Sequence, residues 1–224
     1  MPWRAPDELR PMRHLVLVRH GESELNAANR QTRIYCGQIE TPLTAAGREQ
    51  AIAAARQLAR FEYLCLTRAI SSPLSRARET LELMLAEWSH SIGLLPASPS
   101  LMERSHGEFE GRDEEEVFAE YPHYRDDPSF NCFMNHFEQH APGGESLAVV
   151  TARAWPVIRE LVETGSGDLL VVSHYNTIRC IVGQALKLPQ AAVLRMRPAN
   201  AIPIVLRYSG DYELLVGHEI LGTD

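Results

Sequence analysis

The chain has no excess of positive charge. Its 224 residues carry 22 lysines and arginines against 29 aspartates and glutamates, which gives a net charge of −7. A surface that binds nucleic acid or an anionic membrane needs a basic field, so this balance argues against both partners. A small anionic ligand is not excluded, because one strongly positive pocket fits inside an acidic protein.

Long apolar runs are also missing. Residues 1–14 hold no apolar segment that would serve as the core of a signal peptide, and no later stretch approaches the length of a membrane span. The cysteines form no Cys-x-x-Cys pair, which favours free thiols over a disulfide or zinc framework. They are Cys36, Cys65, Cys132 and Cys180. We therefore expect a cytoplasmic protein.

Alternating strand and helix signals predict a three-layer α/β/α domain with a mostly parallel mixed sheet. Residues 1–13 are expected to form an irregular leader and 14–224 a single domain, with an inserted lid over about 104–144. Apolar runs rich in β-branched residues predict strands over 14–18, 64–71, 94–97, 168–173, 201–208 and 213–216, the last two antiparallel. Helical spacing predicts helices over 44–60, 73–88, 113–121, 145–164 and 176–186, with Pro73 at a helix start and a kink at Pro156.

Polar residues follow three of these strands at the point where each strand ends. Arg19 and His20 follow the first strand, Ser71 and Ser72 the second, and His174 the strand over 168–173. In open α/β sheets, ligands bind outside the carboxyl ends of the strands. The sequence thus predicts that residues far apart along the chain converge on one crevice.

The residues at this predicted crevice suit phosphoryl transfer. Arg19 and Arg76 present guanidinium forks that match phosphate oxygens, and they favour a neutral, nucleophilic His20 by raising the cost of a second local positive charge. His174 is able to donate to a phosphate oxygen. Glu103, in a polar loop, is the best candidate acid for the leaving oxygen. With this much positive charge from side chains, we expect neither a metal nor a cofactor.

Six ordered sequence blocks resemble the signature of the histidine phosphatase superfamily, which includes the cofactor-dependent phosphoglycerate mutases. They cover roughly residues 14 to 180. The blocks are Leu17-Val-Arg-His-Gly-Glu-Ser23 with Asn26, Gly37 with Thr41-Pro-Leu-Thr44 and Gly47, Ser71-Ser-Pro-Leu-Ser-Arg-Ala77 with Thr80, Leu101-Met-Glu103 with Gly107 and Glu110-Gly111, Pro142-Gly-Gly-Glu-Ser146, and Val171-Val-Ser-His174.

The resemblance implies a phosphoglycerate mutase-like fold and a role for each matching residue. His20 corresponds to the phosphorylated nucleophile, with Arg19, Arg76 and His174 forming the phosphate pocket around it. Glu103 corresponds to the proton donor and acceptor, in preference to the nearby Glu108 and Glu110. Candidate substrate-binding or supporting residues are Glu22, Ser23, Asn26, Cys36, Gly37, Tyr175 and Asn176.

The chain departs from the family pattern after His174. Family members often carry glycine at the next position, whereas this chain has Tyr175. A tyrosine there either narrows the pocket or stacks on a substrate. The departure bears on the substrate and leaves the expected chemistry unchanged.

Phosphatase is preferred over phosphoglycerate mutase because residues 104–145 are poor in positive charge. A mutase holds a bisphosphate and needs extra cations. The stretch has three arginines, no lysine and eleven acidic residues, and it lacks the adjacent arginine pair of mutase members. The three arginines are Arg104, Arg112 and Arg125. The same shortage of basic residues before Gly-Glu-Ser disfavours a bisphosphate sugar as substrate.

Two further alternatives concern the lid and the class of protein. Aromatic residues of the lid either cover a less charged substrate or pin the insertion to the domain; they are Tyr121, Tyr124, Phe130, Phe133 and Phe137. A protein that binds phosphorylated ligands without turnover is disfavoured, because every expected pocket residue is present. The expected partner is a small phosphorylated metabolite. Many family members self-associate, so a homodimer stays open.

Overall fold

A six-stranded sheet forms the centre of the molecule in its computed structural model, which describes residues 12–127 and 133–221. The strand order is β3-β2-β4-β1-β5-β6. The first four strands in this order are parallel, and β5 and β6 are antiparallel, as the sequence predicted. The strands are β1 (Arg13–Arg19), β2 (Leu66–Ser71), β3 (Gly93–Leu94), β4 (Asp168–Ser173), β5 (Ile204–Tyr208) and β6 (Tyr212–Val216).

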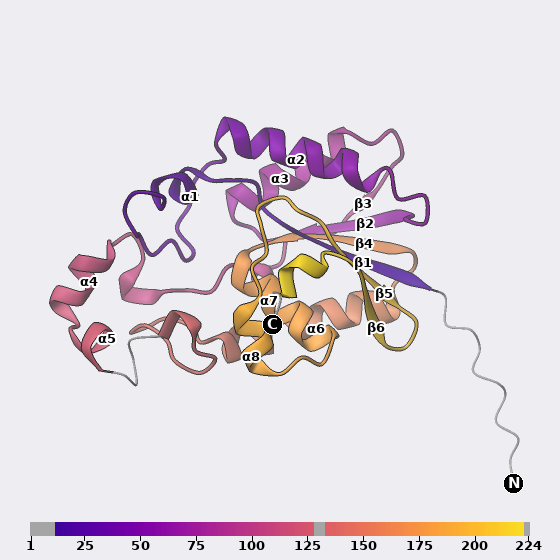
Figure 1. Cartoon of the computed structure of the whole chain (residues 1–224). Coiled ribbons are helices and arrows are strands. Elements are labelled where there is room, and N and C mark those ends of the chain that lie inside the picture. The colour runs from indigo at the N-terminus through magenta and orange to yellow at the C-terminus, as the bar shows by residue number, and fades with distance from the viewer. Residues whose placement is uncertain (1–11, 128–132, 222–224) are drawn as a thin grey trace, which may run out of the picture.

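Helices cover both faces of this sheet, which confirms the three-layer prediction (Figure 1). One face carries α2 (Ala45–Leu58) and α3 (Ser75–Ala86), and the other carries α6 (Leu147–Thr164), α7 (Tyr175–Ala185) and α8 (Gln190–Arg195). Three other helices lie beyond one end of the sheet: α1 (Glu24–Ala28), α4 (Glu114–Glu120) and α5 (His123–Asp126). None of the helices in the described ranges combines the length and the apolar character of a membrane span.

The central strand β1 is buried on both sides, which explains its continuous apolar run. Leu15 and Leu17 pack into the core on the α6 and α7 side, whereas Val16 and Val18 pack into the core on the α2 and α3 side. All four side chains are fully buried. This alternation fixes the strand register, because a slip of one residue would exchange the two faces.

Several helix boundaries differ from the predictions. Helix α3 begins at Ser75, two residues after Pro73, because Leu74 is still extended and its N–H donates to the Ser72 hydroxyl over 3.3 Å. Helix α6 is assigned as one helix of 18 residues with Pro156 inside it, and it begins at Leu147, two residues after the predicted start. The sequence did not predict α1 or α8.

The 104–144 segment has a small core of its own. Tyr124 and Phe133 pack with Phe109 and with Tyr35, which comes from the loop after α1. This packing supports the structural alternative for the aromatic side chains, namely that they pin the segment to itself and to the domain. Phe137 packs against the main cores, while Phe130 and Cys132 lie outside the described residues.

Candidate functional site

The sheet register brings the predicted strand ends together. Arg19 at the end of β1 pairs with Ser173 of β4, and Ser71 of β2 pairs with Val172. The residues that follow are therefore neighbours, and the His20 N–H donates to the Ser173 carbonyl over 3.0 Å. The ring centroids of His20 and His174 lie 5.1 Å apart. The convergence predicted from the strand ends is confirmed for these two histidines.

The hydrogen bonds of His20 define its tautomer. Its Nδ1 lies 2.7 Å from the Gly21 carbonyl oxygen, which only accepts, so Nδ1 carries the proton. The lone pair is then on Nε2, which accepts from the Arg76 Nε over 3.3 Å. Burial, followed by the charges of Arg19 and Arg76, holds the pKa of His20 well below its ordinary value. His20 is therefore a neutral imidazole whose unprotonated nitrogen faces the guanidinium.

The backbone of the loop after α1 orients Arg76. The Arg76 Nη1 donates to the Ile39 carbonyl over 2.7 Å, and Nη2 donates to the Gly37 carbonyl over 2.9 Å. Gly37 has φ +48, and a Cβ at this position would lie 2.2 Å from the Glu110 Oε1. Glycine is needed there for both reasons. Gly37 thus acts through its carbonyl oxygen, which holds the guanidinium toward His20.

Tyr175 packs beside Arg19. The ring centroid of Tyr175 lies 5.2 Å from the guanidinium carbon of Arg19 and 5.1 Å from that of Arg179. The Tyr175 hydroxyl donates to the Met196 carbonyl over 3.1 Å. Arg19 Nη1 donates to the Pro198 carbonyl over 3.1 Å, while its buried Nε has no partner among the described residues. Tyr175 therefore supports Arg19 and also lines the cavity.

His174 lies behind His20 and is fully buried. Its Nε2 is 2.7 Å from the Ser72 hydroxyl, and its Nδ1 has no partner in the described part of the chain. Burial, followed by the neighbouring positive groups, lowers the pKa of His174 well below its ordinary value. A neutral His174 has one ring N–H as a hydrogen-bond donor and adds no positive charge to the site. Its expected donation to a phosphate oxygen stays a prediction.

Glu103 is held by backbone amides. Its Oε1 accepts from the Arg104 N–H over 2.8 Å and from the Asn176 N–H over 3.2 Å, the latter at the start of α7. The side chain is 9% exposed and faces the cavity. Asn176 itself contributes its N–H to this contact, and its side chain accepts from Arg179.

A cavity of about 410 Å³ joins these groups. Of the predicted site residues, those that line it are Arg19, His20, Ser23, Asn26, Cys36, Gly37, Arg76, Glu103 and Tyr175. Glu22, His174 and Asn176 do not line it and support it from behind. In residues 12–127 and 133–221, no group of three His, Cys, Asp or Glu side chains is placed to hold a metal ion.

The residues around α1 have mainly structural partners. Ser23 caps α1, and Asn26 completes a reciprocal capping box with it. Glu22 pairs with Arg30 and accepts from the Thr44 hydroxyl over 3.0 Å. Burial raises the pKa of the Cys36 thiol, which makes this thiol a poor nucleophile. Ser23, Asn26 and Cys36 still present atoms to the cavity, whereas Glu22 does not.

Among the cavity residues missed from the sequence, two have basic side chains, Arg33 and His106. Arg33 lines the cavity and forms an ion pair of 2.9 Å with Glu114 of α4. His106 also lines it, is 4% exposed, and has a buried Nδ1 without a partner among the described residues. Neither stands at a strand end. Only His106 has a sequence signal that points to it, because it lies three residues after Glu103 in the same polar loop.

We expect His106 to make the protein less stable in acid. Burial, and then the charge of Arg104, lowers the pKa of His106 to about 3, against 6.5 in the unfolded chain. The folded state binds fewer protons, so this stability is present above pH 6.5 and is lost as the pH falls toward about 3. When the pH falls from about 7 to 5.5, the unfolding free energy of wild type should decrease by about 1 kcal/mol more than that of His106→Gln. Urea titrations at the two pH values measure this difference.

The exposed His90 provides the matched control for this titration. His90→Gln should leave the pH dependence of unfolding unchanged. Equal pH dependence in wild type and His106→Gln would show that His106 is protonated in the folded protein, contrary to the pKa that its burial implies.

Several basic residues that do not line the cavity have structural partners. His14 donates its backbone N–H to Asp168 over 2.7 Å, and the Nδ1 of its ring lies 3.1 Å from the same oxygen. Arg68 binds backbone carbonyls at the turn before β4, and Arg179 binds those of Val193 and Leu194.

Comparisons with known proteins identify the family of the chain. The model of the histidine phosphatase superfamily (branch 1) matches residues 15–220. A 2,3-bisphosphoglycerate-dependent phosphoglycerate mutase of Bartonella henselae is 30% identical over 202 residues, which are 89% of this chain and 94% of that one. The protein of the same name from a Bradyrhizobium species is 32% identical over 204 residues, 89% and 93% of the two chains.

Solved structures share the fold. A mycobacterial glucosyl-3-phosphoglycerate phosphatase in complex with VO3 superposes with a TM-score of 0.75 at 27% identity, over 91% of this chain and 98% of that one. The α-ribazole phosphatase of Shigella flexneri gives a TM-score of 0.73 at 23% identity, over 94% and 99%, and supports the fold alone.

Proposed function

Because the chain belongs to the histidine phosphatase superfamily, we propose that it is a phosphomonoester hydrolase that works without a metal, through a phosphohistidine on His20. The observation that carries the proposal is the protonation state and orientation of the His20 imidazole. Its proton is held on Nδ1 by the Gly21 carbonyl, and its Nε2 faces the cavity beside Arg76. A neutral imidazole in this orientation is ready to attack phosphorus.

In the first step, the His20 Nε2 forms a bond to phosphorus as the ester P–O bond breaks. Arg19 and Arg76 hold the charge on the equatorial oxygens. Glu103 gives its proton to the leaving oxygen, so the products are an alcohol, phosphohistidine and the Glu103 carboxylate. The Gly21 carbonyl stabilises the positive charge that develops on the imidazole, because it accepts from Nδ1.

In the second step, water attacks the phosphohistidine. The Glu103 carboxylate takes a proton from the water, a P–O bond forms, and the P–N bond breaks. Inorganic phosphate leaves, His20 is again neutral, and Glu103 is again protonated. The same side chain serves as acid and then as base, so the cycle closes without another proton carrier.

The environment of three arginines supports phosphatase over mutase. Arg104 is fully buried and donates to backbone carbonyls, among them Gln139 over 2.7 Å and Glu145 over 2.6 Å. Arg112 pairs with Glu120, and Arg125 pairs with Asp126. These three arginines are absent from the residues that line the cavity. They are thus not placed to hold the second phosphate of a bisphosphate.

Phosphoglycerate mutase is the second candidate. The relatives of this name from Bartonella and Bradyrhizobium, at 30% and 32% identity, are the observation that favours it. The two activities share the phosphohistidine and differ in its fate. Water receives the phosphoryl group in a phosphatase, whereas a second hydroxyl of the glycerate receives it in a mutase.

A single pair of assays separates these candidates. Phosphate release is measured without added metal from 3-phosphoglycerate, fructose 2,6-bisphosphate, a nucleotide and a phosphoamino acid. Conversion of 3- to 2-phosphoglycerate is measured with added 2,3-bisphosphoglycerate. We expect release from one or more esters to exceed conversion. Faster conversion would establish the mutase instead. If neither reaction occurred, the chain would be a protein that binds phosphorylated ligands without turnover.

Arg33 indicates the substrate class. Its side chain is 58% exposed, and its ion pair with Glu114 is of the solvated kind that contributes little. A substrate anion therefore displaces Glu114 at small cost. One cation suits one carboxylate, and phosphoglycerate appears in the names of both the mutases and the mycobacterial phosphatase. We propose a phosphomonoester with a carboxylate on the leaving group.

Arg33→Ala should raise the KM for such a carboxylate ester roughly 10-fold, as expected for one charge-assisted hydrogen bond, and should leave kcat nearly unchanged. Phenyl phosphate, which has no carboxylate, should be hydrolysed as by wild type. The control is Arg112→Ala, which removes an arginine of similar setting away from the cavity. An equal rise in KM for both esters would refute a carboxylate contact.

A further inference from the structure

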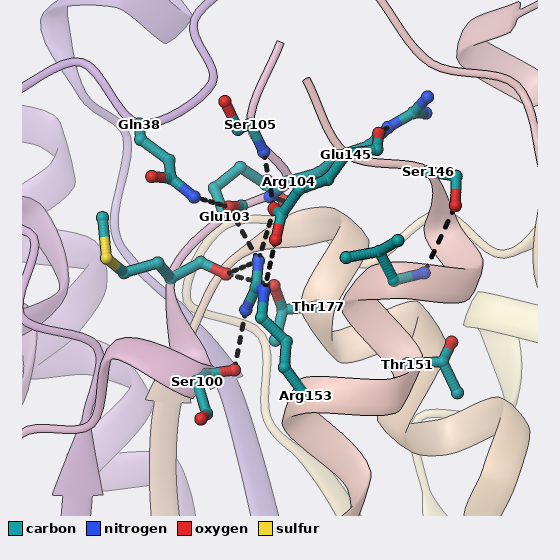
Figure 2. Close-up of polar contacts among 12 residues, drawn as sticks. Gln38, Ser100, Glu103, Arg104, Ser105, Glu145, Ser146, Thr151, Arg153 and Thr177 are labelled. Carbon is teal, nitrogen blue, oxygen red and sulfur yellow. Dashed lines mark hydrogen bonds and ion pairs between the residues drawn. The ribbon is translucent and has the colours of Figure 1, made fainter. Parts of the chain in front are cut away.

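Arg153 of α6 grips the backbone just before and at Glu103. Its Nη1 donates to the Ser100 carbonyl over 2.7 Å, and its Nη2 lies 3.0 Å from the carbonyl oxygens of both Met102 and Glu103. Figure 2 shows the Arg153 guanidinium at the centre of these contacts, rising from α6 toward the loop. One planar group thus fixes several peptide units of the loop that carries the proposed acid.

Glu145 fixes the guanidinium in turn. Its Oε1 accepts from the Arg153 Nε over 2.7 Å and its Oε2 from Nη2 over 2.9 Å, which is the bidentate geometry of a strong pair (Figure 2). The same Oε2 accepts from the Ser105 N–H over 2.9 Å. Glu145 and Arg153 therefore hold the loop on both sides of Glu103. Their side chains are only 19% and 20% exposed, so solvent screens the pair weakly.

From these contacts we infer that Arg153 and Glu145 are positioning residues, which hold the Glu103 carboxyl group at the leaving oxygen. The inference rests on the proposed function, in which Glu103 is the acid. The carboxylate of Glu103 accepts from the N–H of the next residue, Arg104, so its direction follows the backbone that Arg153 holds. Neither positioning residue lines the cavity.

Other contacts keep the loop attached when this pair is weakened. The Thr177 hydroxyl donates to the Met102 carbonyl over 2.6 Å, and the Gln38 Nε2 donates to the Glu103 carbonyl over 2.9 Å. A lysine at position 153 keeps the charge but has no planar fork to bind Glu145 and the carbonyls together. Arg153→Lys should therefore shift the loop without unfolding it.

The test compares two leaving groups in two backgrounds. With Glu103 present, Arg153→Lys should lower kcat/KM for an alkyl phosphate roughly 10- to 100-fold, because small displacements of a catalytic group are costly. The kcat/KM for p-nitrophenyl phosphate, whose leaving group needs little protonation, should fall only a few-fold. This quantity reports the transfer to His20 and is independent of the later attack of water, in which Glu103 also acts. With Glu103→Gln in place, Arg153→Lys should cause no further loss on the alkyl ester. The control is Arg159→Lys, an exposed arginine of the same helix.

The outcomes separate this inference from the proposed function. Equal losses on both esters, or a loss that persists with Glu103→Gln, would show a merely structural role and overturn the inference. No phosphate release by wild type would remove the proposed function and the inference with it. Glu145→Gln is the second variant if Arg153→Lys does not fold. It keeps the side-chain shape, and the same selective loss is expected.

Discussion

His20→Ala is expected to lower kcat for every phosphomonoester by 10⁴- to 10⁶-fold, on the order seen when a nucleophile is removed from a covalent catalyst. The imidazole is the acceptor of the phosphoryl group. The guanidinium groups of Arg19 and Arg76 are not nucleophiles, and the Glu103 carboxyl group is bound by the Arg104 and Asn176 amides as the proposed acid. The fold should survive, because the His20 backbone N–H still bonds to the Ser173 carbonyl. Steady-state phosphate release and thermal unfolding together measure both effects.

A direct trap identifies the intermediate. Wild type mixed with an excess of substrate and quenched at alkaline pH, where phosphohistidine survives, should carry one phosphoryl group on the peptide that contains His20. His20→Ala should carry none. His90→Ala, which removes an exposed histidine, should label and turn over as wild type does. Phosphate release at the wild-type rate by His20→Ala would refute the covalent mechanism.

The location of the site was predictable because it depends on strand ends. Apolar runs mark where β1, β2 and β4 end, and parallel strands bring their carboxyl ends to one edge of the sheet. The placement of His20 and His174 follows from this rule together with the register of β1 on β4. The motif spacing then supplied Arg76, in the first turn of α3, and Glu103, whose position depends on a longer loop.

Side-chain direction was not predictable from motif membership. Glu22 stands two residues after His20, yet its carboxylate points to Thr44 and Arg30. Asn176 contributes its backbone N–H to Glu103, while its side chain serves Arg179. Neighbours in sequence diverge in direction wherever a strand passes into a turn or a helix, so adjacency to a catalytic residue is a weak guide to contact.

Arg33 and Arg153 show why the remaining site residues escaped prediction. Arg33 lies in a loop without periodicity, and it reaches the cavity only because that loop folds against α4. Arg153 lies within the helical pattern of α6, where an arginine ordinarily indicates a solvated face. Its importance arises from the carbonyls of a loop about 50 residues earlier. Such contacts depend on tertiary packing, which local patterns do not encode.

Glu103→Gln is expected to lower kcat/KM for an alkyl phosphate roughly 100-fold or more, the usual contribution of a general acid. Glutamine keeps an oxygen for the Arg104 and Asn176 amides, so the loop should retain its shape. It cannot donate the proton that an alkoxide needs. Because p-nitrophenolate is stable without that proton, kcat/KM for p-nitrophenyl phosphate should fall only a few-fold. The ratio of kcat/KM values on the two esters is the diagnostic quantity, because kcat also includes the attack of water on the phosphohistidine, which both esters share.

The competing carboxylates provide the control for this experiment. Glu108 accepts from the Tyr121 hydroxyl over 2.6 Å, and Glu110 accepts from the His106 N–H over 2.9 Å, so both have structural partners. Glu108 does not line the cavity, and Glu108→Gln should leave the ratio unchanged. If Glu103→Gln slowed both esters equally, Glu103 would orient substrate or water without protonating the leaving group. A selective loss in Glu108→Gln would transfer the acid role to that residue, because only the proton donor distinguishes an alkoxide from a nitrophenolate.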